Sequence, residues 1–344
     1  MRKIRVAING FGRIGRAFFR MAALREEMEI VAINDLGSLD NLAYLLQYDT
    51  AYGRSPFAVA VTGGNLVVEG KTVRFLSERE PAALPWKEMD IDVVVEATGI
   101  FTTYEKAKAH RDAGAKRVVI SAPAKDDPSA CGVKGATVLM GVNNGELAGC
   151  EITSNASCTT NAASPLVAIL GEAVGIERAL LNTVHAYTAS QSLVDSPNKK
   201  DFRDGRAAAA NMVPSSTGAA IAVTKAYPSL GGKFDGIAIR VPVLVGSMVD
   251  VTFVASRATS VEEVNAVLTA AAASERWQGL FAVTREPLVS SDIVGATFAS
   301  IADLSYTLVA DGTLVKVLAW YDNETGYSHT LVQHVAAVGK LLVA

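Results

Sequence analysis

Near its start the chain reads IRVAINGFGRIG from Ile4 to Gly15. The apolar beginning predicts a short buried strand, and the amphipathic segment that follows, residues 16–24, predicts a helix. A second apolar segment at 29–34 predicts another strand that ends in Asp35, twenty residues beyond the last glycine of the motif. Glycines between a strand and a helix, followed at this distance by an acid, are the fingerprint of a dinucleotide-binding domain. The alternative is a glycine-rich turn that binds no ligand.

Each part of this motif has a chemical task in the predicted domain. The first glycine permits a tight turn, the second lets a pyrophosphate approach the backbone, and the third allows the helix to pack closely on the strand. The helix N-terminus faces the phosphates, and Asp35 accepts hydrogen bonds from the adenosine ribose hydroxyls. We therefore predict that the dinucleotide is bound by Gly10, Phe11, Gly12, Arg13, Ile14, Gly15 and Asp35.

The alternation of strands and helices resumes further along the chain. Residues 93–99 predict a buried strand, 104–113 a helix, and 117–121 another strand. Ligands of an open parallel sheet bind at the carboxyl ends of its strands. This predicts further residues of the cofactor cleft, each of which is also ordinary in a turn: Thr98, Gly99, Phe101 and Ser121.

Length and composition exclude several classes of protein. A chain of 344 residues, 50% of them hydrophobic and 19% charged, is expected to form two globular domains. The net charge of −3 is spread along the chain, which predicts no nucleic-acid partner. The three cysteines have neither metal-ligand spacing nor a disulfide pattern, so we expect no metal and a reducing, cytoplasmic location. The longest later apolar run, 237–255, is interrupted by charged residues and a proline, so we expect no membrane span.

The pattern of strands changes in the second half of the chain. Turn signals between residues 57 and 76 predict antiparallel hairpins inserted in the first domain. Later strands predict a mainly antiparallel second domain and fall at 234–243, 247–257 and 305–321. The predicted fold class is α/β, a Rossmann-type domain with a mostly parallel sheet, plus an α+β domain with a mainly antiparallel sheet. The predicted boundaries are 1–157 for the first domain, completed by a C-terminal helix at 323–344, and 158–322 for the second.

A cysteine stands at a predicted helix start in the segment SNASCTTN, from Ser154 to Asn161. A thiol at a helix N-terminus lies near unpaired N–H groups, which favour the thiolate and make Cys158 a candidate nucleophile. A predicted strand at 180–188 carries His185, which can serve as its base. The alternatives are a buried structural cysteine and a core histidine. A thiolate beside a nicotinamide predicts one reaction class, in which sulfur adds to an aldehyde, a hydride leaves, and a thioester remains.

Motifs along essentially the whole chain resemble those of the glyceraldehyde-3-phosphate dehydrogenases. They are NGFGRIGR at 9–16, SNASCTTN at 154–161, TVHAYT at 183–188, RDGR at 203–206, STGAA at 216–220, IRVP at 239–242 and WYDNE at 320–324. The resemblance implies NAD-dependent oxidation of D-glyceraldehyde 3-phosphate, with inorganic phosphate attacking the thioester to give 1,3-bisphosphoglycerate. It also implies a homotetramer, with the loop 190–206 at its core beside a neighbour's cofactor.

The resemblance also assigns roles residue by residue. Cys158 is the nucleophile, and His185 is the base whose imidazolium stabilises the oxyanion together with the backbone N–H of Cys158. The substrate phosphate is held by Thr188 and Arg240. The attacking phosphate is held by Ser157, Thr159, Thr217 and Gly218. Asn323 holds the nicotinamide carboxamide, and Tyr327 is a further cofactor residue.

Three departures from the family's pattern concern oxidation, packing and cofactor choice. Ala162 stands where many members have a second cysteine, and Thr325 stands where tryptophan is common. Asp35 would repel a 2′-phosphate and favours NAD, whereas the segment 36–38 and the pair Ser196-Pro197 leave NADP open. Erythrose-4-phosphate dehydrogenase and a non-catalytic cofactor-binding regulator remain alternatives. Both the glycolytic and the gluconeogenic direction are compatible with the sequence.

Overall fold

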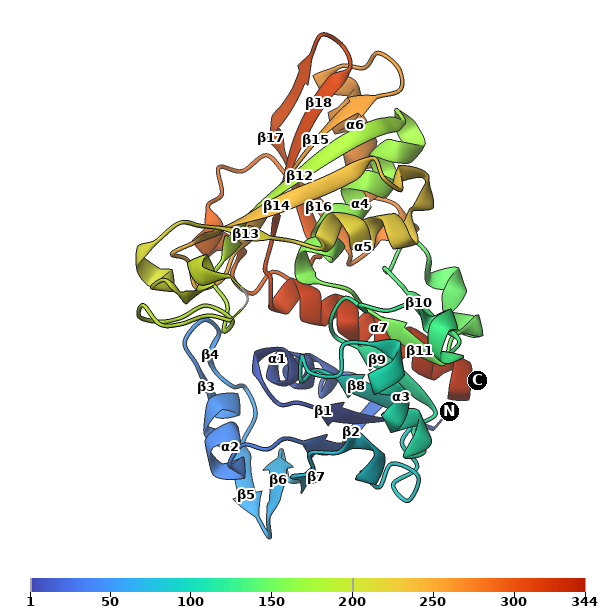
Figure 1. Ribbon diagram of the computed structural model, residues 1–344, viewed down its shortest axis with the longest axis vertical. Coiled ribbons are helices and arrows are strands. Elements are labelled where there is room, and N and C mark those ends of the chain that lie inside the picture. The colour runs from blue at the N-terminus through green and yellow to red at the C-terminus, as the bar shows by residue number, and fades with distance from the viewer. Residues whose placement is uncertain (1, 200, 344) are drawn as a thin grey trace. The chain divides into compact units, whose positions relative to one another are not determined.

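The computed structural model describes residues 2–199 and 201–343, and the chain divides into two compact units, each with its own large sheet (Figure 1). Unit 1 consists of Met1–Met140, Asn144–Ala156 and Ser328–Ala344, and unit 2 of Gly141–Asn143 and Ser157–Tyr327. Residues 1 and 344, which the predicted domain boundaries include, lie outside the described residues.

Unit 1 is built on a nine-stranded sheet in the order β10-β11-β9-β8-β1-β2-β7-β6-β5. The strands from β10 to β7 pair in parallel, and the predicted antiparallel hairpins, β6 and β5, extend the sheet beyond β7. In this sheet β2 and β8 lie on opposite sides of β1, so the strand order reverses at β1. Ligands of such sheets bind at this reversal, next to the carboxyl ends of the strands. The strands are β1 (Ile4–Asn9), β2 (Met28–Asn34), β5 (Val59–Thr62), β6 (Asn65–Val68), β7 (Lys71–Leu76), β8 (Val93–Glu96), β9 (Arg117–Ile120), β10 (Gly135–Thr137) and β11 (Ile152–Ser154), with a separate short pair β3 (Tyr48–Asp49) and β4 (Gly53–Arg54).

Helices cover both faces of this sheet, which explains its nearly continuous apolar strands. On one face, α3 packs with a buried cluster that includes Trp86 and Val94. On the other face, the first turn of α1 lies against Ile8, and α7 lies against Ile4. His334 of α7 also forms a hydrogen bond of 2.8 Å with the hydroxyl of Thr153 in β11. The helices are α1 (Arg13–Ala22), α2 (Leu39–Gln47), α3 (Tyr104–Asp112) and α7 (Thr325–Val343), the last of which belongs to unit 1 from Ser328 onward.

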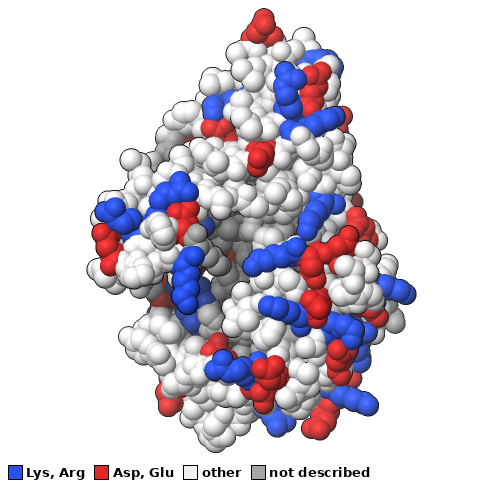
Figure 2. Space-filling view, viewed as in Figure 1, with Lys and Arg blue, Asp and Glu red and all other residues white. Residues whose placement is uncertain are grey.

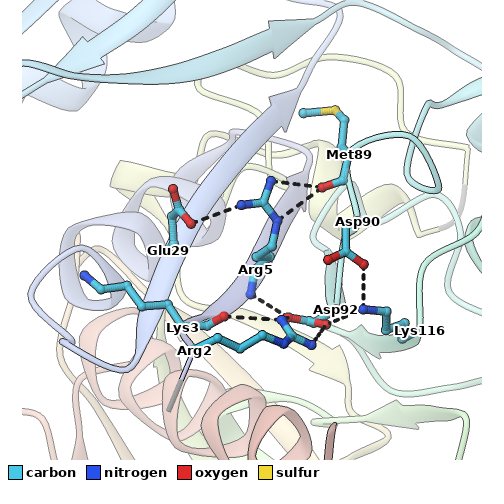
Figure 3. A network of polar contacts seen from close by, with 8 residues as sticks. All are labelled: Arg2, Lys3, Arg5, Glu29, Met89, Asp90, Asp92 and Lys116. Atoms are coloured by element: carbon cyan, nitrogen blue, oxygen red, sulfur yellow. Dashed lines mark hydrogen bonds and ion pairs between the residues drawn. The ribbon is translucent and has the colours of Figure 1, made fainter. Parts of the chain in front are cut away.

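A buried carboxylate ties together the amino-terminal edge of the parallel sheet. Asp92, just before β8, is fully buried and accepts two hydrogen bonds from Arg2, at 2.6 and 2.8 Å (Figure 3). It also accepts one from Lys116 at 3.0 Å and one from the backbone N–H of Arg5 at 2.9 Å. Burial alone would raise the pKa of Asp92, but these partners outweigh it and lower the pKa to about 2.

Asp92→Asn is expected to lower the free energy of unfolding by about 2 kcal/mol at neutral pH, because the amide loses the charge that Arg2 and Lys116 face. Since the pKa of Asp92 is depressed in the folded protein, its contribution is present above the ordinary value of 3.8 and is lost as the pH falls through about 2. Denaturant unfolding of both proteins across this range measures the difference, which should disappear at the acid end. A difference that stays constant with pH would contradict the assignment.

Unit 2 is built on a seven-stranded sheet in the order β13-β14-β12-β15-β18-β17-β16. Four of its six pairings are antiparallel, and β12 with β14 and β16 with β17 are the parallel exceptions. Three helices pack on one face: α4 (Cys158–Ala173), α5 (Ala219–Ala226) and α6 (Val261–Ala272) (Figure 1). The strands are β12 (Ile176–Ala186), β13 (Val213–Ser216), β14 (Phe234–Val241), β15 (Ser247–Ala255), β16 (Phe281–Thr284), β17 (Ser300–Ala310) and β18 (Leu314–Tyr321).

Helix α4 begins at Cys158, which is the helix start that the sequence predicted. Ser157 caps it, since the side-chain oxygen accepts a hydrogen bond from the backbone N–H of Thr160 at 3.1 Å. Pro165 lies inside the helix and cannot donate to the carbonyl of Asn161. The hydroxyl of Ser164 lies 3.4 Å from that carbonyl and replaces the missing donor, so the helix continues to Ala173.

Among the described residues, no helix is both long and apolar enough to cross a membrane. Figure 2 shows lysine and arginine interspersed with aspartate and glutamate over the face in view. Surface ion pairs such as Arg257 with Glu263 (2.6 Å) and Arg276 with Glu172 (2.9 Å) neutralise positive side chains locally.

Candidate active site

The glycine motif of unit 1 forms a turn that only glycine can adopt at two positions. Gly10 has φ +94°, and a Cβ there would lie 2.6 Å from the backbone nitrogen of Thr98. Gly15 lies in the first turn of α1, whereas the sequence predicted that the helix begins after it, and a Cβ there would collide with the carbonyl oxygen of Gly10. Gly12, at the N-cap of α1, has open space around it. The backbone is therefore bare where a phosphate would approach.

Asp35 follows β2 and holds this turn in place. Its carboxylate accepts hydrogen bonds from the backbone N–H of Phe11 at 2.6 Å and of Gly37 at 2.8 Å. The acid that the sequence placed twenty residues after the motif therefore contacts the motif itself. A Cβ on Gly37 would lie 3.1 Å from Oδ1 of Asp35, so this side of the carboxylate is closely packed.

A cleft of about 460 Å³ opens at the carboxyl ends of β1, β2 and β8. Five of the predicted cofactor residues line it: Gly10, Gly12, Asp35, Thr98 and Phe101. Arg13 points elsewhere, with its guanidinium 2.9 Å from the Asp49 carboxylate and 5.8 Å from the centre of the Tyr52 ring. Ser121 lies at the end of β9, where its N–H donates to the backbone of Glu96, and it is not among the described residues that line the cleft.

The sequence interpretation missed several polar residues at this cleft, two of which, Asn9 and Asn34, line it. Asn9, Asn34 and Glu96 are the last residues of β1, β2 and β8, and each is almost fully buried. The signal was present, because each is a polar residue that ends an otherwise apolar strand. Their contacts with one another join strands far apart in the sequence and could not be predicted from local pattern.

In unit 2 the structure brings Cys158 and His185 together. Cys158 is the first residue of α4, and His185 stands next to the last residue of β12, on the face that the helices cover. The Sγ atom of Cys158 lies 3.3 Å from Nε2 of His185. This distance allows a proton to pass between the two groups.

Arg240 completes the group around the histidine. It lies opposite His185 in the parallel pairing of β12 with β14, and its Nη1 is 2.6 Å from Nδ1 of His185. The same Nδ1 lies 2.6 Å from the carbonyl oxygen of Ala186, which is also 3.2 Å from Nη1 of Arg240. Because the guanidinium can only donate, Nδ1 can either accept from Arg240 or donate to Ala186, but not both.

Burial dominates the protonation of this group. It raises the pKa of the Cys158 thiol, against the charge of Arg240 and the hydrogen bonds of Thr159. Burial and the charge of Arg240 lower the pKa of His185 to about 3. Burial therefore opposes the stabilisation of the thiolate expected at a helix N-terminus, to which the backbone hydrogen bonds of Cys158 and Thr159 contribute. The thiol needs an acceptor for its proton, and a neutral His185 lies within reach.

Tyr321 contacts His185 and the residue that follows Cys158, and the sequence interpretation did not identify it. Its hydroxyl bonds to the hydroxyls of Thr159 at 2.9 Å and Thr183 at 2.8 Å, and its ring packs edge-on against His185 with centroids 5.9 Å apart. It joins β18, β12 and the first turn of α4. Only its place in the WYDNE motif could have drawn attention to it.

The other predicted residues of unit 2 make local contacts. Thr188 bonds to the hydroxyl of Ser190 at 3.0 Å, and Thr217 accepts from the backbone N–H of Ala219 at 3.2 Å, beside Gly218 at the N-cap of α5. The amide oxygen of Asn323 accepts from the N–H of Gly246 and the hydroxyl of Ser247, at 3.2 and 2.9 Å, which fixes the orientation of the amide. Tyr327 is buried.

The fold and the site together define a two-domain, dinucleotide-dependent oxidoreductase. The family described as "Glyceraldehyde 3-phosphate dehydrogenase, NAD binding domain" matches residues 4–104, and "Glyceraldehyde 3-phosphate dehydrogenase, C-terminal domain" matches 157–323. The chain belongs to the glyceraldehyde-3-phosphate dehydrogenase family. This confirms the predicted fold class, the resemblance, the assignment as an enzyme, and NAD as the cofactor of the first domain.

Curated relatives match over nearly their whole length. Glyceraldehyde-3-phosphate dehydrogenase 2 of Streptomyces arenae is 48% identical over 342 residues, which cover 98% of this chain and 99% of the relative. The enzyme of Geobacillus stearothermophilus is 47% identical over 337 residues, covering 97% and 98%. Glyceraldehyde-3-phosphate dehydrogenase A of Escherichia coli K12 is 46% identical over 337 residues, covering 98% and 99%.

Proposed function

We propose that this enzyme catalyses the NAD-dependent, phosphorylating oxidation of D-glyceraldehyde 3-phosphate to 1,3-bisphosphoglycerate. The observation that carries the proposal is the 3.3 Å approach of Cys158 Sγ to His185 Nε2, with Arg240 bound to the other ring nitrogen. A nucleophile, a base and a phosphate-binding cation are the groups that a phosphorylated aldehyde requires. The family membership and the names of the relatives agree with this substrate.

The first half of the reaction forms the thioester. Sγ of Cys158 attacks the aldehyde carbon while its proton passes to Nε2 of His185, which returns a proton to the former carbonyl oxygen and yields a hemithioacetal. His185 then takes the hydroxyl proton back as the hydride leaves the same carbon, and a thioester remains. NAD, when bound, supplies the acceptor for that hydride. The backbone N–H of Cys158 is the proposed second donor to the oxyanion.

The second half releases the product. An oxygen of inorganic phosphate attacks the thioester carbonyl, the carbon–sulfur bond breaks, and the sulfur regains a proton from His185. The attacking phosphate is assigned to Ser157, Thr159, Thr217 and Gly218. The hydroxyls of Ser157 and Thr159 already have partners within the protein, and each keeps one further bonding position for phosphate.

Arg240 has two proposed tasks, and Thr188 shares the first. The guanidinium of Arg240 binds the phosphate of the substrate, because its N–H groups match the geometry of phosphate oxygens. When it turns toward that phosphate, Nδ1 of His185 is released to donate to the carbonyl of Ala186. The proton then lies on Nδ1, and the lone pair on Nε2 faces the thiol.

The cofactor is assigned to the cleft of unit 1, with the pyrophosphate at Gly10 to Gly15 and the ribose at Asp35. The bare glycine backbone fits a pyrophosphate, since a side chain at Gly10 or Gly15 would collide with the chain itself. Other cofactor contacts are assigned to Phe11, Arg13, Ile14, Thr98, Gly99, Phe101, Ser121 and Tyr327, and the nicotinamide carboxamide to the oriented amide of Asn323. The dinucleotide-binding domain is assigned to 1–157 with the helix 323–344, and the catalytic domain to 158–322.

A homotetramer in the cytoplasm is also proposed. Its support in the structure is the face of the unit 2 sheet that carries no helix. This face exposes large apolar side chains, namely Leu180, Ile237, Tyr306, Leu308 and Leu314. Apolar patches of this kind mark protein interfaces. The loop 190–206, which exposes Leu193, Val194 and Phe202, is the second proposed contact.

A single assay tests the proposed activity. Purified enzyme, NAD and inorganic phosphate are mixed with D-glyceraldehyde 3-phosphate, and NADH is followed at its absorbance band. Rapid, phosphate-dependent formation of NADH is expected. A higher kcat/KM with D-erythrose 4-phosphate would move the substrate to the four-carbon aldehyde, and no NADH with either aldehyde would contradict the enzymatic function. With NADP in place of NAD, a lower kcat/KM is expected, because a carboxylate at the proposed ribose site, Asp35, would repel a 2′-phosphate.

A further inference from the structure

A chain of buried polar side chains lies under the dinucleotide cleft of unit 1. At its centre is Glu96, which is 1% exposed. One carboxylate oxygen accepts from the side chains of Asn9 at 2.6 Å and His110 at 2.9 Å. The other accepts from the backbone N–H of Thr98 at 2.9 Å and from the hydroxyl of the same residue. Each oxygen of the Glu96 carboxylate therefore accepts two hydrogen bonds.

The histidine of this chain is held in one tautomer. His110 is fully buried, and its Nδ1 lies 3.0 Å from the indole nitrogen of Trp86. An indole N–H can only donate, so Nδ1 must accept and the ring proton lies on Nε2. That proton points to Glu96. The Trp86 side chain thereby fixes His110 as a donor to the carboxylate.

Each end of the chain reaches a wall of the cleft. The Thr98 turn that Glu96 holds packs against Gly10, where a Cβ would lie 2.6 Å from the Thr98 nitrogen. Phe101, which lines the cleft, packs edge-on against His110 with ring centroids 6.3 Å apart. On the other side, Asn9 accepts from Asn34 at 2.7 Å.

Asn34 links this network to Glu78, which lines another side of the cleft. Its amide exchanges two hydrogen bonds of 2.8 Å with the backbone of Glu78, which also lines the cleft. The next residue is Asp35, whose carboxylate holds the N–H of Phe11. The carboxyl ends of β1, β2 and β8 are thus joined by one hydrogen-bonded network, of which Asn9 and Asn34 line the cleft and Glu96 does not.

We propose that Glu96 and His110 are positioning residues for NAD, which hold the Gly10 and Thr98 turns and the Phe101 wall in the shape that binds the dinucleotide. The inference rests on the proposed location of NAD in this cleft. Neither side chain needs to touch the cofactor, since both act through residues that do. A carboxylate suits this position because it alone offers acceptors to all four donors.

Glu96→Gln is the direct test. The glutamine has nearly the same shape, but its NH₂ group faces either Thr98 or the pair Asn9 and His110, so one set of donors loses its acceptor. We expect the Kd for NAD, measured by titration calorimetry, to rise about tenfold. The KM for NAD should rise in parallel, while kcat at saturating NAD stays within about twofold, because the reacting atoms are untouched.

Asp92→Asn serves as a matched control. Asp92 is also a buried carboxylate with four hydrogen bonds, but it lies at the opposite end of β8, away from the cleft. The Asp92→Asn substitution should lower the melting temperature and leave the Kd for NAD within about twofold of wild type. If Glu96→Gln lowers only the melting temperature and binds NAD as wild type does, Glu96 is merely structural and the inference is wrong.

A second variant keeps the test informative if Glu96→Gln does not fold. Trp86→Phe preserves an aromatic ring beside His110 and removes the indole N–H that fixes its tautomer. A rise of about threefold in the Kd for NAD is expected, and an unchanged Kd would contradict the inference. Wild-type protein that fails to bind NAD would instead contradict the proposed function, so the two failures are distinguishable.

Discussion

Cys158→Ser lowers kcat for the aldehyde by about 10⁴-fold or more, the largest effect expected of any single substitution in this chain. A serine hydroxyl is a far weaker acid than a thiol, and His185, whose pKa burial and Arg240 lower to about 3, is too weak a base to ionise it. The steady-state rate of NADH formation at saturating substrate measures the loss. The Kd for NAD should stay within about twofold of wild type, because the turn proposed to bind the dinucleotide is not altered.

The control for this variant is another cysteine. Cys131 is half-buried in unit 1, with its Sγ 3.3 Å from the carbonyl of Pro128, a contact that a serine hydroxyl can also make. Cys131→Ser should therefore keep the kcat of wild type. Substantial activity in Cys158→Ser, or an equal loss in Cys131→Ser, would remove Cys158 from its role as nucleophile.

Local pattern was sufficient for most of the fold. The strand, turn and helix at the start of the chain follow from apolar runs interrupted by glycines, and the hairpins of β5 to β7 follow from turn residues. Local pattern failed at the boundary of α1, where a close approach of two backbone segments decides which residue fits. The sequence predicted that the helix begins after Gly15, but Gly15 lies inside α1, where a side chain would collide with the carbonyl oxygen of Gly10.

The sequence was sufficient to pair Cys158 with His185, but not to identify the residues that hold them and the cofactor cleft in place. Cys158 and His185 were paired in the sequence because a nucleophile needs a base, and the structure brings their atoms together. The sequence alone does not reveal Tyr321 or Glu96, since each joins strands that are far apart in the sequence. The pKa of the Cys158 thiol depends both on the helix start and on burial. A helix start is visible in the sequence, whereas the burial that opposes it depends on the whole of unit 2.

His185→Asn is expected to lower kcat/KM by about 10²- to 10⁴-fold, since the thiol loses the acceptor for its proton. The variant also has a signature in the pH dependence of thiol alkylation. Burial raises the pKa of Cys158, and a neighbouring imidazole that takes the proton opposes this by forming an ion pair with the sulfur. Without the imidazole, the pKa of Cys158 should rise, and the pH midpoint of its reaction with iodoacetamide should move to higher pH.

His334→Asn is the matched control for that shift. His334 is likewise fully buried with its pKa lowered to about 3, but it bonds to Thr153 and Asn155 within unit 1. Its replacement should destabilise the fold and leave the alkylation midpoint of Cys158 where it is in wild type. If His185→Asn leaves the midpoint unchanged, His185 does not share the thiol proton, and its 3.3 Å contact with Cys158 is packing alone. A shift in His185→Asn only, together with the loss in kcat/KM, is the combination that a base acting on the thiol requires.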